Sequence, residues 1–327
     1  MRLGLTILLC SAATGQLGVS QTTKPAVIGI LNYPHAVNDL DTTVAFYKDV
    51  FGLELSRPPN AFPNPGVPSL VNAPGISLRL AMYRMPGAPF VLELTHFSGV
   101  ERKPAQPQEP DPGAADLQLR VRDIDAVFEK IKKSGAPIIT RSGAPVKFAN
   151  SDTRAILVRD PDGYILEVMQ TPPPANAPAG MVHSVAMGLT VDNMEATEKF
   201  YHEMLGFEFM GSREYHNDEA IRDLVNAPAG ADYRQMSSVV PGTNARVDFY
   251  EWRNVPRKKF HLRVYDPGAP ALVLRVNDLD GMLKRLRNIG TEVISARGEI
   301  VQFGPTTRNI FVVDPNGVNI ELYETKN

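Results

Sequence analysis

Residues 160–170 read DPDGYILEVMQ, and residues 314–324 read DPNGVNIELYE. Both stretches open with a turn, because proline presets the first turn residue, Asp or Asn bonds its own backbone, and glycine accepts a positive φ. A short apolar strand follows each turn, and each strand carries a glutamate, Glu167 or Glu321, at the same place. A carboxylate repeated within two apolar strands indicates a duplicated unit.

The duplication extends over most of the chain. Several pairs of stretches recur in one order: FYKDVFGLEL at 46–55 with FYHEMLGFEF at 200–209, LVNAPG at 70–75 with LVNAPAG at 224–230, and LQLRVRDID at 117–125 with LVLRVNDLD at 272–280. Self-similarity of this kind marks a tandem repeat. We therefore predict one domain at 26–170 and a second at 181–325. The linker between them, TPPPANAPAG at 171–180, is stiffened by its prolines.

Each copy contains two smaller units with the same order of elements. In the first unit, DLDTT at 39–43 supplies N-cap side chains for a helix that Gly52 ends. We expect the other elements of the first copy to be strands at 76–84 and 90–97, then strand 116–121, helix 123–134, and strands at 137–140, 154–159 and 164–169. A strand, a helix and two or three strands therefore occur four times along the chain, which predicts an α+β fold.

Side chains alternate along each predicted strand. Glu167 shares a face with Ile165 and Met169, whereas Leu166 and Val168 point the other way. The same division recurs in four other strands, whose mixed faces carry Glu93, Glu321, Asp248, and the trio Asp116, Gln118 and Arg120. We expect the aliphatic faces to pack against the helices. The apolar residues among the acids favour a sheltered concave cup over a solvent-facing surface.

Composition limits the classes of function. The chain has 327 residues, of which 43% are hydrophobic and 21% charged, and this suits two globular domains. A net charge of −2 leaves no electrostatic footprint for nucleic acid. We expect a small-molecule ligand, no nucleic-acid partner and no membrane span, in a protein that is a monomeric pseudo-dimer or a homodimer.

The N-terminus has the pattern of an export signal. Arg2 is followed by the apolar run LGLTILLCSAA and then by small residues. We predict a signal peptide at 1–20 that is cleaved between Ala13 and Gln21, and a secreted or periplasmic mature protein. The alternatives are an unprocessed N-terminus and lipidation at Cys10. Because Cys10 is the only cysteine, the mature protein would have no disulfide and no thiolate ligand.

Five motifs together resemble the vicinal oxygen chelate superfamily, which includes glyoxalase I, extradiol dioxygenases, fosfomycin-resistance enzymes and bleomycin-resistance proteins. They are NDLDTTVAFYKDVFGLEL, VDNMEATEKFYHEMLGFEF, VLELTHFSG, DPDGYILEV and DPNGVNIEL, and the resemblance spans nearly all of 27–325. It implies tandem glyoxalase-like domains built of βαβββ modules, with each pair of modules forming a curved sheet around a cup. In metal-dependent members a divalent cation lies in that cup.

The resemblance also implies ligand positions. They fall on Asn32, Glu93, Asp116 and Glu167 in the first copy, and on Ala186, Asp248, Ala271 and Glu321 in the second. Adjacent modules that share a cup would bring the first four together as an all-oxygen metal site, which suits a hard cation. Modules that swap partners across the duplication would instead group Asn32, Glu93, Ala271 and Glu321, and separately Asp116, Glu167, Ala186 and Asp248. We predict the quartet Asn32, Glu93, Asp116 and Glu167.

Two functions follow from this resemblance. The first is an exported enzyme with one divalent metal, with Mg²⁺, Mn²⁺, Ca²⁺ or Ni²⁺ favoured over iron. It would act on a small vicinal-oxygen substrate as a lyase, isomerase or dioxygenase, with Glu167 and Glu93 catalytic and Arg120 and Gln118 binding the substrate. The second is a metal-free binding protein of the bleomycin-resistance type, with a degenerate second domain. Arg120 could instead pair with an acid, and His35 is expected to be structural.

Overall fold

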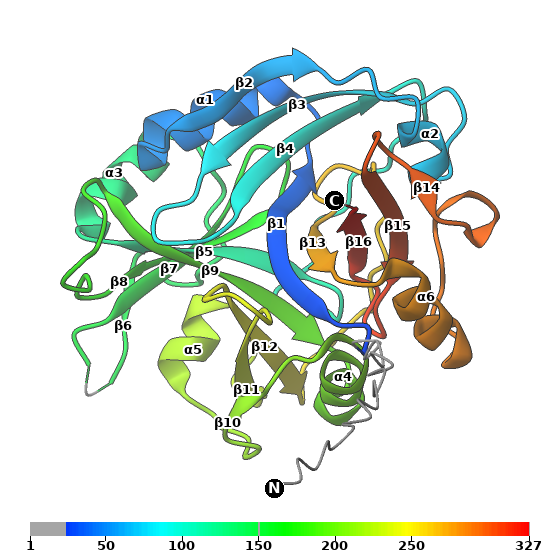
Figure 1. The fold of residues 1–327 in the computed structure, drawn as a ribbon. Helices are drawn as coiled ribbons and strands as arrows, with labels where there is room; N and C mark the ends of the chain where they lie inside the picture. Colours follow the sequence, from blue (N-terminus) through cyan, green and yellow to red (C-terminus); the bar gives the residue numbers. More distant parts are fainter. Residues whose placement is uncertain (1–23, 150, 327) are drawn as a thin grey trace, which may run out of the picture.

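The structure is a computed structural model that describes residues 24–149 and 151–326 (Figure 1). The predicted signal peptide at 1–20, with Cys10, lies outside the described residues. Among the residues that are described, no helix is both long enough and apolar enough to cross a membrane.

Four modules follow one another along the chain, which confirms the predicted α+β fold. The first has β1 (Val27–Ala36), α1 (Leu40–Phe51), β2 (Leu55–Ala61), α2 (Val67–Leu70), β3 (Ser77–Arg84) and β4 (Val91–Ser98). The second has β5 (Ala115–Val121), α3 (Ile124–Ser134), β6 (Val146–Lys147), β7 (Arg154–Arg159) and β8 (Ile165–Gln170).

The second copy repeats this order with small insertions. The third module has β9 (Val182–Val191), α4 (Met194–Phe200), the π-helical η1 (Tyr201–Leu205), β10 (Met210–Gly211), α5 (Glu219–Leu224), β11 (Asp232–Val239) and β12 (Arg246–Arg253). The fourth has β13 (Ala271–Val276), α6 (Leu279–Asn288), the 3₁₀ turn η2 (Ala296–Gly298), β14 (Val301–Gln302), β15 (Thr307–Val313) and β16 (Asn319–Thr325).

The ends of α1 are where the sequence predicts them. The Asp39 side chain accepts hydrogen bonds from the backbone N–H groups of Asp41 and Thr42, and Gly52 ends the helix with φ 66°. The strand predicted at 137–140 is wrong, because only Ile138 forms an isolated bridge there. The Thr140 hydroxyl accepts a hydrogen bond from the Leu157 N–H at 2.8 Å. A side chain therefore takes the place of the backbone carbonyl that would continue strand pairing.

The modules pair across the duplication rather than within each copy. One eight-stranded sheet has the order β14-β15-β16-β13-β1-β4-β3-β2 and joins the first module to the fourth. The other has the order β10-β11-β12-β9-β5-β8-β7-β6 and joins the second module to the third. The central joints, β1 with β13 and β5 with β9, are both antiparallel. Each predicted domain therefore contributes one module to each sheet.

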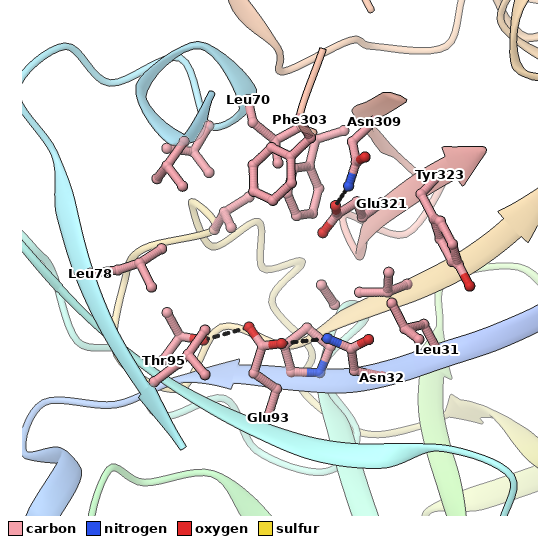
Figure 2. Close-up of a pocket in the computed structure, with 18 of the residues that line it drawn as sticks. Leu31, Asn32, Leu70, Leu78, Glu93, Thr95, Phe303, Asn309, Glu321 and Tyr323 are labelled. Atoms are coloured by element: carbon pink, nitrogen blue, oxygen red, sulfur yellow. Dashed lines mark hydrogen bonds between the residues drawn. The ribbon is translucent and has the colours of Figure 1, made fainter. Parts of the chain in front are cut away.

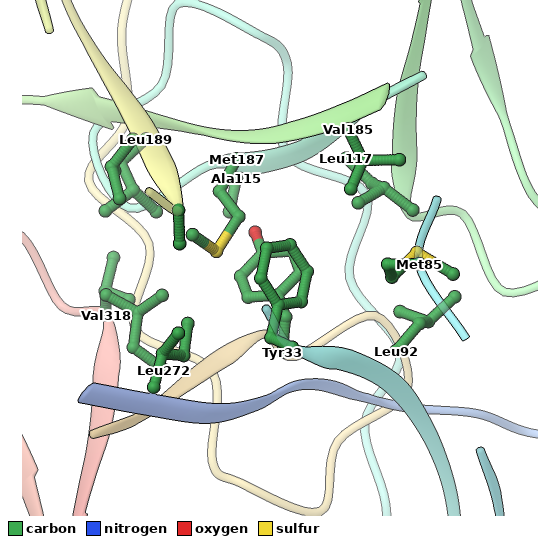
Figure 3. Packing of buried hydrophobic residues seen from close by; sticks show 14 of the residues in the cluster. Tyr33, Met85, Leu92, Ala115, Leu117, Val185, Met187, Leu189, Leu272 and Val318 are labelled. Carbon is green, nitrogen blue, oxygen red and sulfur yellow. The ribbon is translucent and has the colours of Figure 1, made fainter. Parts of the chain in front are cut away.

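The aliphatic faces of the central strands pack against each other. Figure 3 shows Tyr33, Leu92 and Leu272 of the first sheet facing residues of β5 and β9 in the second sheet. The expectation that these faces pack against helices therefore holds only at the flanks, where α1 contacts β3, β4 and α3. The Tyr33 hydroxyl donates to the backbone carbonyl of Asp116 at 3.2 Å. Because side chains alternate, the neighbouring Asn32 points away from this core.

The turn at 160–163 locks the two modules of the first copy together. Asp162 accepts hydrogen bonds from the Asn38 N–H and the Thr43 hydroxyl, and the Tyr47 hydroxyl donates to Asp160 at 3.2 Å. The second copy repeats this contact at the other turn: Tyr201 donates to Asp314 at 3.1 Å, and Asn316 bonds Thr197 and the Asp192 N–H. The turns at 160–163 and 314–317 therefore join modules that lie in different sheets.

Asp162→Ala should lower the free energy of unfolding by about 2–4 kcal/mol, because it leaves the Asn38 N–H and the Thr43 hydroxyl without their partner in a buried place. Urea unfolding followed by circular dichroism measures the change. Asp152→Ala is the matched control, because the Asp152 side chain is fully exposed. Equal unfolding midpoints for the two variants would contradict the role given to the turn.

Candidate functional site

A cavity of about 550 Å³ lies in the cup of the first sheet (Figure 2). Apolar side chains such as Leu70, Leu78 and Phe303 line much of it. The polar lining comes from β1, β4, β13, β15 and β16. It includes His35, Arg275, Thr307, Tyr323 and Thr325, together with Asn32, Glu93, Thr95, Asn309 and Glu321. We call this cavity the first cup.

Glu93 is held by two neighbours in the first cup. The Asn32 side-chain amide donates to one carboxylate oxygen, and the Thr95 hydroxyl donates to the other at 2.9 Å. Burial raises the pKa of Glu93 above its ordinary value, although both hydrogen bonds oppose that shift. The side chain therefore holds its proton more tightly than a carboxyl in water.

Glu321 extends into the same cup from the fourth module, and Figure 2 shows it on the opposite side of the space from Glu93. The Asn309 side-chain amide donates to it. Burial raises the pKa of Glu321 to about 7, and the negative charge of Glu93 adds to the shift. Near neutral pH Glu321 can therefore accept or release a proton, as acid–base chemistry requires.

A smaller cavity of about 220 Å³ lies in the cup of the second sheet, and we call it the second cup. Four carboxyls line it: Glu109, Asp116, Glu167 and Asp248. Burial is the main cause of raised pKa values here, with repulsion between the acids adding to it. The pKa is about 8 for Glu109, about 7 for Glu167, and well above the ordinary value for Asp116.

Polar neighbours of these acids come from β5, β11 and β12. Gln118 donates to the Tyr250 hydroxyl at 3.0 Å, and Asp248 is bonded by Ser237 and by Arg246 at 2.9 Å. Arg120 lies near enough to Glu167 to oppose the rise of its pKa. Within the described ranges, however, Arg120 forms no ion pair within 4.0 Å.

The predicted metal quartet does not form one site. Asn32 and Glu93 lie in the first cup, whereas Asp116 and Glu167 lie in the second, together with the predicted substrate-binding residues Gln118 and Arg120. The grouping is wrong because the two modules of one copy belong to different sheets, which turn their mixed faces away from a shared core. Adjacent pairing, on which the quartet rested, is thereby excluded.

Sequence reasoning missed several polar residues of the cups, among them Asn309 and Glu109. Asn309 alternates with Ile310 along β15, and that pattern could have placed its amide on the cup side beside Glu321. Glu109 lies in the loop before β5, where no periodicity indicates which way a side chain points. Only the folded chain brings Glu109 to the second cup.

Three buried side chains stand close enough together to share a metal ion. Ligand atoms of His35, Asp160 and Asp162 all lie within 4.8 Å of one another, and they are the one such group of His, Cys, Asp and Glu among the described residues. His35 Nε2 is 3.2 Å from Asp160 Oδ2, and burial lowers the pKa of His35 to about 3, so the imidazole is neutral. Asp160 and Asp162 belong to the turn that joins the modules, and His35 contacts this turn from β1.

Comparison with known proteins identifies the family to which the chain belongs. The model of the Glyoxalase/Bleomycin resistance protein/Dioxygenase superfamily matches residues 30–168 and 181–322. A lactoylglutathione lyase from Oryza sativa subsp. japonica is 28% identical over 193 residues, which are 57% of this chain and 56% of that protein. A lactoylglutathione lyase from Haemophilus influenzae is 30% identical over 141 residues, which are 43% of this chain and 91% of that protein. The chain thus spans about half the length of the rice relative.

Solved structures agree in fold. Glyoxalase I from Zea mays superposes with a TM-score of 0.56 at 19% identity, covering 92% of each chain. A putative dioxygenase from Bacillus subtilis gives a TM-score of 0.56 at 14% identity, covering 92% of this chain and 86% of that one. At such identities the likeness shows the fold alone.

Replacing Glu321 by Gln should make the protein more stable relative to the parent as the pH rises. In the folded protein the Glu321 carboxyl keeps its proton up to about pH 7, whereas in the unfolded chain it releases the proton near pH 4.5. The parent protein's free energy of unfolding therefore falls as the pH rises between these values. The unfolding free energy of Glu321→Gln minus that of the parent should grow by roughly 3 kcal/mol from pH 4.5 to 8. Denaturant titrations at several pH values measure this difference. The exposed Glu101→Gln serves as control, and parallel curves for both variants would refute the assignment.

Proposed function

Because the chain belongs to the Glyoxalase/Bleomycin resistance protein/Dioxygenase superfamily, we propose that the first cup is an active site for a small molecule with neighbouring oxygen atoms. The reaction we propose is a lyase- or isomerase-type proton transfer between adjacent carbons. The observation that carries the proposal is the pair of carboxyls, Glu93 and Glu321, on opposite sides of a largely apolar cavity.

The two carboxyls have complementary roles in this proposal. Glu321, with a pKa of about 7, takes a proton from a carbon next to a carbonyl group, and the electron pair moves to the carbonyl oxygen. The Glu93 carboxyl passes the proton of the hydroxyl group on the first carbon to that oxygen as its negative charge grows. Glu321 then returns its proton to the former carbonyl carbon, and the carbon whose hydroxyl group lost its proton becomes the new carbonyl, so the substrate is isomerised without net gain or loss of atoms.

The first cup also offers donors that fit a hard divalent cation. The Asn32 and Asn309 side-chain oxygens are buried and have no hydrogen-bond partner among the described residues, and they stand beside Glu93 and Glu321. An all-oxygen set suits Mg²⁺, Mn²⁺ or Ca²⁺, whereas Ala271 contributes no ligand at the remaining family position. When bound, such a cation would act as a Lewis acid toward the substrate oxygens.

Proton transfer is favoured over oxygen chemistry. Non-haem iron oxygenases use two histidines and a carboxylate, and the family positions of the first cup offer no histidine. The relatives from rice and Haemophilus influenzae are named lactoylglutathione lyases, which supports a lyase of small carbonyl compounds here.

A metal-free binding protein is the second candidate. In its favour, the Asn32 and Asn309 amides already satisfy Glu93 and Glu321, and the apolar lining suits capture of an amphipathic molecule. In this function the carboxyls would orient the ligand and carry out no reaction.

The test is an activity screen of residues 21–327 with α-ketoaldehydes, alone and with glutathione, in the presence of Mg²⁺, Mn²⁺, Ca²⁺ or Ni²⁺. We expect turnover that rises with pH and levels off above about pH 7, because Glu321 must be ionised to accept the proton. Glu321→Gln should lower kcat by roughly 10²–10⁴. Glu101→Gln, whose side chain is exposed, is the matched control.

Elemental analysis of the same samples separates the two candidates. One equivalent of a divalent metal in the parent, lost in Glu93→Gln and Glu321→Gln, would support the enzyme. Ligand binding that survives chelation, without turnover of any carbonyl compound, would instead support the binding protein and end the proton-transfer proposal.

We also propose that the protein is exported, on the strength of the apolar run that follows Arg2. Expression of the full chain in a Gram-negative host should release a periplasmic product whose N-terminus lies between residues 14 and 21. N-terminal sequencing of the fractionated protein tests this. An intact Met1 in the cytoplasmic fraction would exclude the signal.

A further inference from the structure

The lining of the second cup holds four carboxyl groups but only two arginines, Arg120 and Arg246. Asp248 is paired with Arg246, but one carboxylate oxygen of Glu109 and one of Asp116 have no hydrogen-bond partner in the part of the chain that the structure describes. Both residues line the cavity, and only 5% of Glu109 and 3% of Asp116 is exposed. Buried acceptors without donors are costly, so these two oxygens indicate that a donor enters the cup.

The acids are too widely spread to suit a bare metal ion. A set of at least three with ligand atoms within 4.8 Å of one another occurs, among the described residues, only at His35, Asp160 and Asp162. Glu109, Asp116, Glu167 and Asp248 therefore do not close around one point. A hard metal ion needs several ligands around one point, whereas an ammonium group can be held by hydrogen bonds to two carboxylates.

Part of the wall of the second cup is apolar and aromatic. Phe148, Met169, Tyr233 and Trp252 line it, and the rings of Tyr233 and Trp252 pack with centroids 5.3 Å apart. Aromatic faces attract cations and also accept alkyl groups. The cavity of about 220 Å³ limits the occupant to a small molecule.

We propose that the second cup binds a small organic cation of the alkylammonium class. The ammonium group bonds to the unpartnered oxygens of Asp116 and Glu109, and the alkyl part lies against the aromatic wall. A positive charge at this place offsets the burial and repulsion that raise the pKa values of these acids. The site is separate from the first cup and does not depend on the function proposed there.

Gly188 of β9 makes room for the acid at the centre of this site. A Cβ atom at position 188 would stand 2.1 Å from a carboxylate oxygen of Asp116, so any other residue would force this carboxylate to move. The backbone of Gly188 has an ordinary φ, which means that space, and not conformational freedom, requires glycine here. Gly188→Ala is therefore a variant that displaces Asp116 without removing its charge.

Isothermal titration calorimetry of residues 21–327 with n-butylammonium chloride tests the proposal. The comparison ligands are 1-butanol, which has the same alkyl chain without the charge, and MgCl₂ and MnCl₂ at matched ionic strength. We expect one butylammonium to bind per chain. Asp116→Asn and Gly188→Ala should each weaken binding about tenfold or more, because a hydrogen-bonded charge contributes on the order of 1.5–3 kcal/mol.

Glu93→Gln, in the first cup, should bind the amine as the parent does, which separates this site from the proposed active site. Far-UV circular dichroism and thermal unfolding confirm that each variant is folded. Equal binding of 1-butanol would overturn the proposal in favour of a merely apolar pocket. Stoichiometric Mg²⁺ or Mn²⁺ binding that excludes the amine would make the second cup a metal site, and no binding of any probe would also overturn the proposal.

Discussion

The packing of two sheets through their central strands is the constraint on which the rest of the structure depends. Tyr33 and Leu272 of the first sheet meet Leu117 and Met187 of the second in one continuous core (Figure 3). Because strand side chains alternate, burying one face of each sheet commits the other face to a cup. Both candidate sites are consequences of this arrangement, and they lie on opposite sides of the same core.

Burial acts on the acids of both cups, but their partners differ. In the first cup, Glu93 and Glu321 each receive an amide hydrogen bond, and the two carboxyls face each other across a largely apolar cavity. In the second cup, Asp116 and Glu109 keep oxygens without donors. The low local dielectric makes the first arrangement suited to holding and moving a proton, and the second suited to receiving a cation.

Much of this could be predicted from local patterns. The N-cap at Asp39, the helix end at Gly52 and the cup-facing direction of Glu93 and Glu167 follow from turn chemistry and alternation, and the structure agrees with them. The strand expected at 137–140 does not form, because the Thr140 hydroxyl accepts a hydrogen bond from the Leu157 N–H in place of a backbone carbonyl. Glu109 had no signal, since loops have no periodicity.

The sequence by itself determined that four similar modules exist, where each begins, and which face of each strand is polar, because these depend on neighbouring residues. Only the tertiary structure decided which modules share a sheet. Adjacent and swapped pairing satisfy the same alternation, and the choice lies in the long-range joints of β1 with β13 and β5 with β9. That choice places Glu93 opposite Glu321 and not beside Glu167, since strands far apart in the chain complete each cup.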